Sequence, residues 1–600
     1  MPKSIIHNVA RVIMNYNLNH SSATSAPKKS IFESIQKILF FLKDERKVLY
    51  LAFFAMFVNA WLSLVAPFLI GHTIDNYIAV KQYNGVLLFS GILLILYILA
   101  MVTSYLQTQM MGTVGQRMLF NLRNAVFNKL QELPVDFFNQ NKAGDLISRI
   151  NNDTDKLNQF FSQFLVQFIG SIFVMSGAAI FLLAINLKLG AAALIPALFL
   201  LVFTRIISPL VKRKNAINLK SAGTMSAEIQ ESLNNFRVIV AFNRRDYFRK
   251  RFDEANQENY KTAVQAGLVN NFLMPVYGLS ANFGQLIVLA FGIYLVASGT
   301  FTIGLLISFL AYINNFYNPL RQIAAIWPNF QTALAAWDRV SKILELESNL
   351  VIISDDHTEP DAPLVSFKNV SFGYPNGQEV LHHVSFDLNK GKTYAFVGPT
   401  GGGKTTTASL IARLYDANKG SILLEGKDIR SYSAAERSAK IGFILQEPFF
   451  FSGTIRENIL YGNEAYKHYT NDELTLVLKE AGLDSLLERF DAGLDTVVRS
   501  TGDGVSLGQK QLIAFMRAVL RKPGVLILDE ATANIDTITE QLLEEILRKL
   551  PESTTRVIIA HRLNTIENAD EIYFVNAGEV VRAGSLANAM ELLLKGKRIS

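Results

Sequence analysis

The stretch Phe396-Val-Gly-Pro-Thr-Gly-Gly-Gly-Lys-Thr-Thr406 decides the fold of the C-terminal half of the chain. Residues 398–405 within it fit the pattern G-x-x-x-x-G-K-[ST]. The apolar run 394–397 before the loop predicts a buried strand, and residues 406–414 after it predict a helix. Glycines let a backbone approach phosphate oxygens closely, and the free N–H groups at a helix start attract an anion. The stretch therefore predicts a strand, a phosphate-binding loop and a helix.

The side chains of this loop have the chemistry to bind a nucleoside triphosphate together with its metal ion. Lys404 supplies a positive charge for the β- and γ-phosphates, and the Thr405 hydroxyl suits Mg²⁺. An ordinary glycine-rich turn is the alternative, and further motifs along the chain argue against it. The candidate nucleotide-binding residues of the loop are Gly398, Pro399, Thr400, Gly401, Gly402, Gly403, Lys404, Thr405 and Thr406.

Composition divides the 600 residues into a membrane-like half and a soluble-like half. Half of all residues are hydrophobic, the mean hydropathy is +0.22, and the apolar residues concentrate in the first 330 positions. The net charge of +7 fits the basic cytoplasmic loops of a membrane protein, and no base-reading module appears, so we expect no nucleic-acid partner. The chain has no cysteine, which excludes disulfides, cysteine-bound zinc and thiol catalysis.

Six long apolar runs predict membrane-spanning helices. At about 1.5 Å per residue, runs of this length cross a hydrocarbon core of about 30 Å. Core helices of a large soluble protein are the alternative, which six such runs disfavour. The expected spans are residues 48–71, 86–110, 160–185, 190–211, 268–296 and 303–327.

The segments outside the spans predict the orientation in the bilayer. The long connections 112–159 and 212–267 are rich in Lys and Arg, which places both of them and both termini in the cytoplasm. Residues 1–30 form a basic, acid-poor tail, either disordered in the cytosol or an organelle transit peptide. Residues 31–42 predict an amphipathic helix on the membrane surface.

Both long connections contain a break in their helical pattern, at residues 134–140 and 236–242. We expect a helical extension, a short crosswise turn and a helical return at each, although structural filler is the alternative. Such a turn could press on a soluble domain. The spans also hold polar side chains, which either face a substrate path or join helices by hydrogen bonds. These are Asn59, Asn282, Gln285, Asn314, Asn315 and Asn318.

Several motifs follow in order along the C-terminal half. They are Phe372-Gly-Tyr-Pro375, Gly442-Phe-Ile-Leu-Gln-Glu-Pro448, Val505-Ser-Leu-Gly-Gln509, Val525-Leu-Ile-Leu-Asp-Glu530, Ala533-Asn-Ile-Asp536 and Arg556-Val-Ile-Ile-Ala-His561. With the phosphate-binding loop, this series resembles the ATP-binding cassette (ABC) transporters, specifically half-transporters of exporter type. The resemblance covers residues 31–590. Within this family the chain resembles the catalytic subunit of bacterial heterodimeric multidrug exporters.

The resemblance implies a role for each matching residue. Tyr374 would stack on the adenine of ATP. Gln446 would touch Mg²⁺ or water, and Asp529 would bind the Mg²⁺ that Thr405 also holds. The remaining implied roles are the catalytic base for Glu530, a γ-phosphate contact for His561, the D-loop acid for Asp536, and a phosphate-facing helix start for Ser506, Gly508 and Gln509.

The signature motif departs from the family pattern L-S-G-G-Q, because Leu507 replaces a glycine. We expect this replacement to cost backbone freedom and to add bulk beside the phosphate. In this family the signature of one subunit closes on the phosphate loop of the other. The intact catalytic residues and the altered signature therefore imply a heterodimer with a second half-transporter, with one strong and one weak ATP site; a homodimer is the alternative.

We therefore expect a multi-domain membrane protein, with a six-helix all-α transmembrane domain followed by an α/β P-loop ATPase domain. The expected parts are a tail (1–30), the transmembrane domain (31–345), a linker (346–363), the nucleotide-binding domain (364–590) and a C-terminal tail (591–600). The expected function is ATP-driven export of drug-like, lipid or peptide cargo, in a bacterial inner membrane. A homodimeric flippase, an ATP-gated channel or regulatory subunit and a soluble P-loop ATPase are alternatives.

Overall fold

The computed structural model describes residues 16–18, 41–355, 361–375, 377–499, 505–529, 537–559, 566 and 568–595. The chain forms two compact units. The sheet unit comprises Met1–Ser21, Glu132–Ala143 and Leu346–Ser600. The helical unit comprises Ser22–Gln131 and Gly144–Glu345. The segment expected to form a surface helix, residues 31–42, lies outside the described residues except for its last two.

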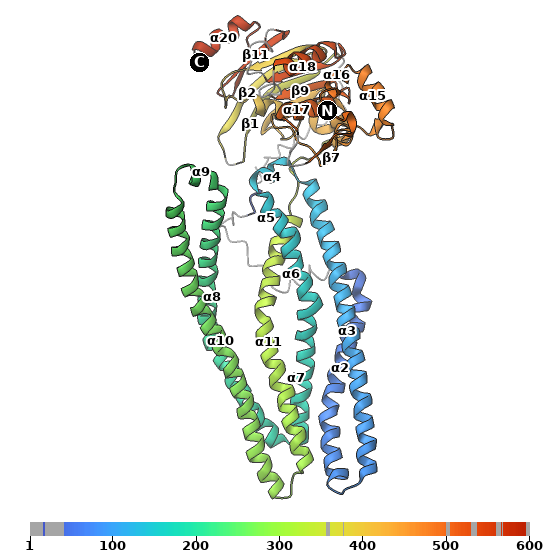
Figure 1. The fold of residues 1–600 in the computed structure, drawn as a ribbon, viewed down its shortest axis with the longest axis vertical. Helices are drawn as coiled ribbons and strands as arrows, with labels where there is room; N and C mark the ends of the chain where they lie inside the picture. Colours follow the sequence, from blue (N-terminus) through green and yellow to red (C-terminus); the bar gives the residue numbers. More distant parts are fainter. Residues whose placement is uncertain are drawn as a thin grey trace, which may run out of the picture. The chain divides into compact units, whose positions relative to one another are not determined.

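Long helices make up the helical unit (Figure 1). Short π-helical turns interrupt some of them without ending the helical path. In chain order the elements are η1 (Lys43–Glu45), α2 (Arg46–Thr73), η2 (Ile74–Ile78), α3 (Tyr83–Glu132), α5 (Ala143–Ser148), η3 (Arg149–Asp153), α6 (Thr154–Gln159), η4 (Phe160–Phe164), α7 (Leu165–Ile185), α8 (Leu187–Asn234), α9 (Phe236–Ala241), α10 (Arg245–Ala297) and α11 (Ile303–Leu344).

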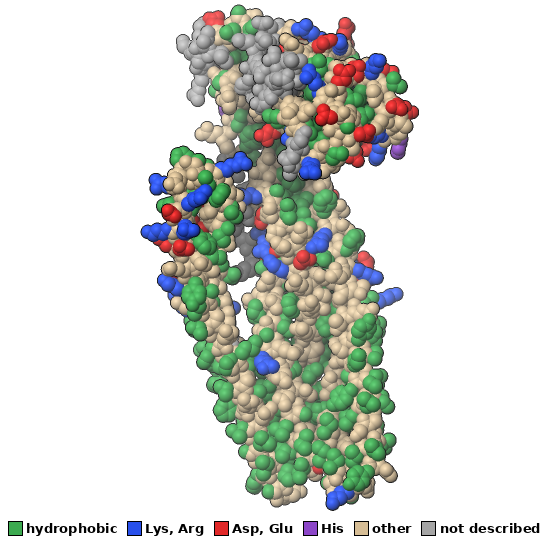
Figure 2. All heavy atoms as spheres, viewed as in Figure 1, with side chains coloured by type: hydrophobic (Ala, Val, Ile, Leu, Met, Phe, Trp, Pro, Cys, Tyr) green, Lys and Arg blue, Asp and Glu red, His purple; other side chains and the backbone are tan. Residues whose placement is uncertain are grey.

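The predicted spans are helical. Five helical stretches among the described residues are long and apolar enough to cross a membrane, and they contain the first five expected spans. The sixth expected span lies in α11, which runs on without a break to Leu344. Figure 2 shows hydrophobic side chains covering the visible face of these helices, with charged side chains gathered near α9. Only 6% of the most apolar stretch of α3 is buried, as expected where lipid covers a helix.

The breaks predicted in the two long connections are short helices. α9 (Phe236–Ala241) joins α8 to α10 within the helical unit, and its Ile239 is buried. α4 (Val135–Gln140) follows α3 in the chain but belongs to the sheet unit. Pro134, at the N-cap of α4, has an extended backbone, which ends one helical direction and starts another.

The described residues of the sheet unit form three sheets. The six-stranded sheet has the order β12-β11-β3-β10-β9-β6, in which every pairing except β11 with β12 is parallel. The four-stranded sheet β2-β1-β4-β5 is antiparallel, and β7 pairs with β8. The strands are β1 (Val365–Gly373), β2 (Glu379–Leu388), β3 (Thr393–Val397), β4 (Lys419–Leu424), β5 (Lys427–Asp428), β6 (Ile441–Ile444), β7 (Gly453–Thr454), β8 (Val497–Val498), β9 (Val525–Asp529), β10 (Thr555–Ile559), β11 (Glu571–Asn576) and β12 (Glu579–Arg582).

Two apolar clusters stabilise the sheet unit, one on each face of the parallel strands. One contains Ala395 of β3 and the other contains its neighbour Phe396, because successive side chains of a strand point to opposite faces. The helices of this unit are α4, α12 (Lys404–Ile411), η5 (Ile429–Ser431), α13 (Ala434–Lys440), α14 (Ile455–Leu460), η6 (Glu464–Tyr466), α15 (Asn471–Glu480), α16 (Asp484–Leu487), η7 (Gly493–Asp495), α17 (Leu507–Val519), α18 (Thr537–Lys549) and α20 (Leu586–Lys595).

Two segments expected to be loosely attached pack against the sheet unit. Tyr16 is 1% exposed and Leu18 is 8% exposed, so the expectation of a disordered tail is wrong for these residues. The expected linker is also bonded to the domain that follows it. Arg413 donates to the carbonyl oxygen of Val351 (2.8 Å), and the Asp428 backbone N–H donates to Asp355 (2.9 Å). The buried polar groups of Arg413 and Asp428 thus form hydrogen bonds with the expected linker. The composition of that segment does not predict these bonds.

Candidate nucleotide site

Glycine geometry brings the phosphate-binding loop close to β11. A Cβ on Gly398 would lie 2.0 Å from the carbonyl oxygen of Val575, and a Cβ on Gly402 would lie 2.6 Å from the same oxygen. Gly403, the N-cap of α12, has φ +114, a conformation that glycine adopts readily. The loop therefore needs glycine at these three positions for reasons of space and backbone conformation.

Lys404 lies across its own loop. Its side chain is buried, and Nζ donates to the carbonyl oxygens of Gly398 (2.8 Å) and Pro399 (3.0 Å). These bonds hold the ammonium beside the loop backbone, at the start of α12, where the partial positive charge of the helix already favours an anion. The arrangement suits binding of a polyphosphate.

The Thr405 hydroxyl lies 3.2 Å from the Asp529 carboxylate, to which it donates a hydrogen bond. Asp529 is 2% exposed at the end of β9, whereas Thr405 is exposed in the first turn of α12. A hydroxyl beside a carboxylate offers the oxygen ligands that Mg²⁺ prefers, with nucleotide phosphates and water completing its octahedron. The described residues hold no cluster of three or more His, Cys, Asp or Glu side chains that would form a closed metal site. The residues present therefore fit a Mg²⁺ ion shared with a bound nucleotide.

Parallel strands gather the remaining candidates along one edge of the sheet. The loop follows β3, Asp529 ends β9, and Gln446 comes two residues after β6. In the strand registers Phe396 of β3 pairs with Ile559 of β10, and Ile559 pairs with Asp529. Because carboxyl ends of parallel strands meet at one edge, the loop and Asp529 share that edge.

Three predicted site residues lie outside the described residues. They are Glu530, which follows β9 directly, His561, which follows β10 by two positions, and Asp536. The strands that lead to Glu530 and His561, β9 and β10, pair in parallel.

Tyr374 lies at the end of β1 and is 36% exposed. Its hydroxyl is 3.2 Å from the Thr406 hydroxyl, which joins it to the helix after the phosphate loop. The ring of Tyr415 meets the Tyr374 ring edge-on at 5.3 Å, and Phe372 meets it edge-on at 5.1 Å. An exposed aromatic face held by two other rings can stack on a base. Sequence analysis missed Tyr415, because no local pattern marks a residue that supports another ring.

The altered signature begins α17 with an intact capping box. Ser506 accepts a hydrogen bond from the Gln509 backbone N–H (3.2 Å), and the Gln509 side chain accepts one from the Ser506 N–H (2.9 Å). Leu507 is the first helical residue, is 43% exposed and does not have a positive φ. The helix therefore starts at Leu507 with a backbone that leucine adopts readily. The added bulk remains.

Polar side chains of the helical unit join helices. Asn59 of α2 donates to the Ala100 carbonyl (2.8 Å) and to Thr103 (3.0 Å) on α3, and Gln285 donates to Asn314 (2.8 Å) across α10 and α11. These contacts match the helix–helix alternative for the intramembrane amides.

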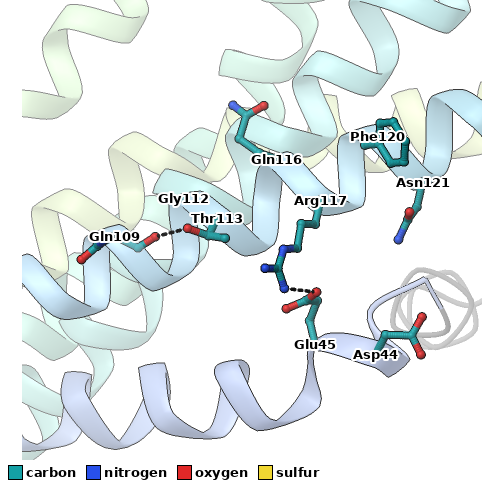
Figure 3. Close-up of a pocket in the computed structure, with 9 residues that line it drawn as sticks. All are labelled: Asp44, Glu45, Gln109, Gly112, Thr113, Gln116, Arg117, Phe120 and Asn121. Carbon is teal, nitrogen blue, oxygen red and sulfur yellow. Dashed lines mark hydrogen bonds and ion pairs between the residues drawn. The ribbon is translucent and has the colours of Figure 1, made fainter.

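A hollow of about 780 Å³ lies beside the 2.7 Å ion pair of Arg117 with Glu45 (Figure 3). Six of its nine lining residues are charged or carry an amide, and this mixture identifies no cargo. The lining residues are Asp44, Glu45, Gln109, Gly112, Thr113, Gln116, Arg117, Phe120 and Asn121.

Comparison with known proteins decides the family. Residues 49–320 match the model of the ABC transporter transmembrane region, and residues 381–533 match the ABC transporter model. The chain is 35% identical over 570 residues to the ABC transporter ATP-binding protein YfiC of Bacillus subtilis, covering 93% of this chain and 92% of YfiC. The chain belongs to the ABC transporter family. This ABC transporter is a multi-pass membrane protein that couples ATP hydrolysis to transport.

Two further relatives have names that state a cargo. A fatty acid ABC transporter ATP-binding/permease protein of Mycobacterium bovis is 33% identical, with 83% of this chain and 78% of the relative covered. A multidrug resistance ABC transporter ATP-binding and permease protein of Lactococcus lactis is 32% identical, with 82% of this chain and 83% of the relative covered. Like these ABC exporters, the chain joins one transmembrane region to one ATPase domain, and such half-transporters work as dimers.

Proposed function

We propose that this half-transporter exports drug-like, lipid or peptide cargo from the cytoplasm by alternating access, as one subunit of a heterodimer. The observation that carries the proposal is that one chain joins a transmembrane region, with six long helices among the described residues, to an ATPase domain with a phosphate loop. The relatives named for fatty acids and for multidrug resistance support an apolar or amphipathic cargo. The basic long connections support cytoplasmic termini in a bacterial inner membrane.

In the proposed site, the chain's own residues bind ATP at the carboxyl edge of the six-stranded sheet. Tyr374 contacts the base, and the loop 398–406 surrounds the phosphates with backbone N–H groups and the Lys404 ammonium. Thr405, Asp529 and Gln446 would hold Mg²⁺, which supplies charge neutralisation at the phosphates when bound. In this proposal Asp536 has the role of the family's D-loop acid.

Glu530 acts in this proposal as the base that takes a proton from the attacking water. The new bond forms between the water oxygen and the γ-phosphorus, and the bond to the bridging oxygen breaks, leaving ADP and inorganic phosphate. His561 contacts the γ-phosphate and keeps it in line. Catalysis is mainly positioning and charge stabilisation, as in other phosphoryl transfers.

The choice between heterodimer and homodimer depends on the signature. Ser506, Gly508 and Gln509 would face the ATP held by the partner subunit, and the bulk of Leu507 beside them supports a weakened second site. The intact capping box and the helical backbone at Leu507 favour a second candidate, a homodimeric drug or lipid flippase in which the signature tolerates leucine.

The deciding experiment measures vanadate-sensitive ATPase activity of the purified chain alone in liposomes, beside Glu530→Gln and Leu507→Gly. For the heterodimer we expect little activity in the native chain and at least about a tenfold gain in Leu507→Gly, which restores room beside the phosphate. Full activity in the native chain that Glu530→Gln abolishes would establish the homodimer instead. Full activity in Glu530→Gln would remove the assignment of the base.

Export itself is tested by ATP-dependent movement of a lipophilic fluorescent cation and of a fluorescent fatty acid, in proteoliposomes of the form that hydrolyses ATP in the first experiment, the native chain or Leu507→Gly. We expect transport of at least one probe, at a rate comparable with ATP turnover, and none with Glu530→Gln. Ion flux much faster than ATP turnover would replace the exporter by an ATP-gated channel.

A further inference from the structure

Residues 16–18 connect two segments that are distant in the sequence. The Tyr16 hydroxyl donates to the Glu347 carbonyl oxygen (3.0 Å) and accepts from the Asn349 backbone N–H (2.9 Å). Burial raises the pKa of Tyr16, so its hydroxyl keeps the proton that it donates. Tyr16 is therefore bonded to the segment that enters the sheet unit after α11.

Residues 16–18 are also bonded to α4, through Asn141 at its C-terminal end. Its side-chain amide donates to the carbonyl oxygens of Tyr16 (2.9 Å) and Phe137 (2.8 Å), and accepts from the Leu18 backbone N–H (3.1 Å). Asn141 is 6% exposed and Phe137 is fully buried, with the Tyr16 ring edge-on to the Phe137 ring at 6.3 Å. Three buried hydrogen bonds from one side chain fix a position closely, because breaking any of them leaves a polar group unsatisfied.

Helix α4 in turn bonds to the ring cluster at Tyr374. Asn139 donates to the Tyr415 hydroxyl at 2.6 Å, and the Tyr415 ring meets the Tyr374 ring edge-on at 5.3 Å. Burial raises the pKa of Tyr415 to about 12, so this hydroxyl is also neutral at physiological pH. A continuous path of contacts within the sheet unit thus leads from Tyr16 to the proposed base-stacking ring.

We propose that Tyr16 and Asn141 are positioning residues for ATP binding: they fix α4, and α4 holds Tyr415 against Tyr374. The N-terminal segment is then a working part of the nucleotide-binding unit. This inference rests on the proposed contact of Tyr374 with the base. It adds that the orientation of this ring depends on residues 16–18, which lie near the N-terminus, far from Tyr374 in the sequence.

The test is equilibrium binding of ATP and of inorganic tripolyphosphate to the full chain in detergent, with EDTA present to stop hydrolysis. The variants are Asn141→Ala, Tyr16→Phe and Tyr415→Phe. Tyr432→Phe is the matched control, because its hydroxyl donates to the Leu424 carbonyl (2.8 Å) and the residue belongs to no part of the proposed path.

We expect each of the three variants to weaken ATP binding about two- to tenfold, the range for losing one or a few neutral hydrogen bonds. Tripolyphosphate binding should stay within about twofold of the native value, because the phosphate loop is untouched. The double variant Asn141→Ala/Tyr415→Phe should lose less than the product of its single losses, since both act through one path. Tyr432→Phe should bind both ligands like the native chain.

Tyr374→Ala distinguishes the base contact of Tyr374 from the positioning role of Tyr16 and Asn141. If it weakens ATP binding while Asn141→Ala and Tyr16→Phe do not, the base contact stands and the positioning role is overturned. If Tyr374→Ala leaves ATP binding unchanged, the proposed base contact itself fails, and this inference falls with it. Equal losses for ATP and tripolyphosphate in Asn141→Ala would indicate general damage to the unit and also overturn the positioning role.

Discussion

The hydroxyl of Thr405 lies 3.2 Å from the carboxylate of Asp529, although 124 positions separate them in the sequence. The first residue follows β3 and the second ends β9, with β10 between these strands. The contact therefore depends on a correctly ordered parallel sheet. Once the sheet forms, two oxygens from distant parts of the chain face one small space beside the phosphate loop.

We predict that Thr405→Val and Asp529→Asn abolish the gain in ATP affinity that Mg²⁺ provides. Both changes keep the shape of the side chain while removing one oxygen ligand or its charge. Losing a hydrogen bond or ligand contact to a charged group should reduce ATP binding in Mg²⁺ by about 10- to 100-fold. The measurement is the ATP dissociation constant with Mg²⁺ and with EDTA. In the control Thr407→Val, whose hydroxyl only bonds the Gly403 carbonyl, the Mg²⁺ gain should persist.

We predict that Gly398→Ala removes ATP binding, because the new methyl would lie 2.0 Å from the Val575 carbonyl at φ +147. The loop must shift, at a cost of about 1–3 kcal/mol or more. Gly584→Ala is the control: it also has a positive φ, +74, but nothing lies within 4 Å of the added Cβ. ATP binding by the full chain in detergent distinguishes the two. Normal ATP affinity in Gly398→Ala would contradict the close approach of the loop to β11.

A third prediction concerns Asp136 of α4, which is 4% exposed and accepts a hydrogen bond from Gln140 (3.0 Å). Burial raises the pKa of Asp136 above its ordinary value of 3.8. Below that value both folded and unfolded states are protonated. As the pH rises, the unfolded state ionises first, so this group lowers stability through the window between 3.8 and the raised pKa, and the loss remains above it.

Asp136→Asn should therefore raise the thermal unfolding midpoint of the full chain at pH 7.5, and the gain should shrink toward pH 4. Asp491→Asn, an exposed carboxylate in the same unit, serves as the control and should change the midpoint little at either pH. A lower midpoint for Asp136→Asn at pH 7.5 would show that the ionised carboxylate stabilises α4, contrary to this prediction.

The sequence was a good guide where one short stretch determines the structure. The loop at 398–405 and the strand that ends in Asp529 are local patterns, and both elements form as predicted. At Leu507 the sequence alone did not reveal that the residue takes the first helical position, where leucine fits the backbone. The bond from Asn139 to Tyr415 and the bond from Asn141 to the Tyr16 carbonyl could not be predicted, because each joins residues more than a hundred positions apart and leaves no periodic signal.

The inclusion of Glu132–Ala143 in the sheet unit has a consequence for how the protein is made. Asn139 leaves the ribosome 276 residues before its partner Tyr415. At about 5–20 residues per second, α4 waits roughly 14 to 55 seconds for the surface that it packs against. During that interval Phe137 has its earlier-made neighbour Tyr16, but α4 lacks the cover that Leu346–Ser600 provides. The nucleotide-binding unit is therefore assembled late, from three segments that membrane helices separate in the sequence. A fragment beginning at Leu346 would lack the first two of these segments.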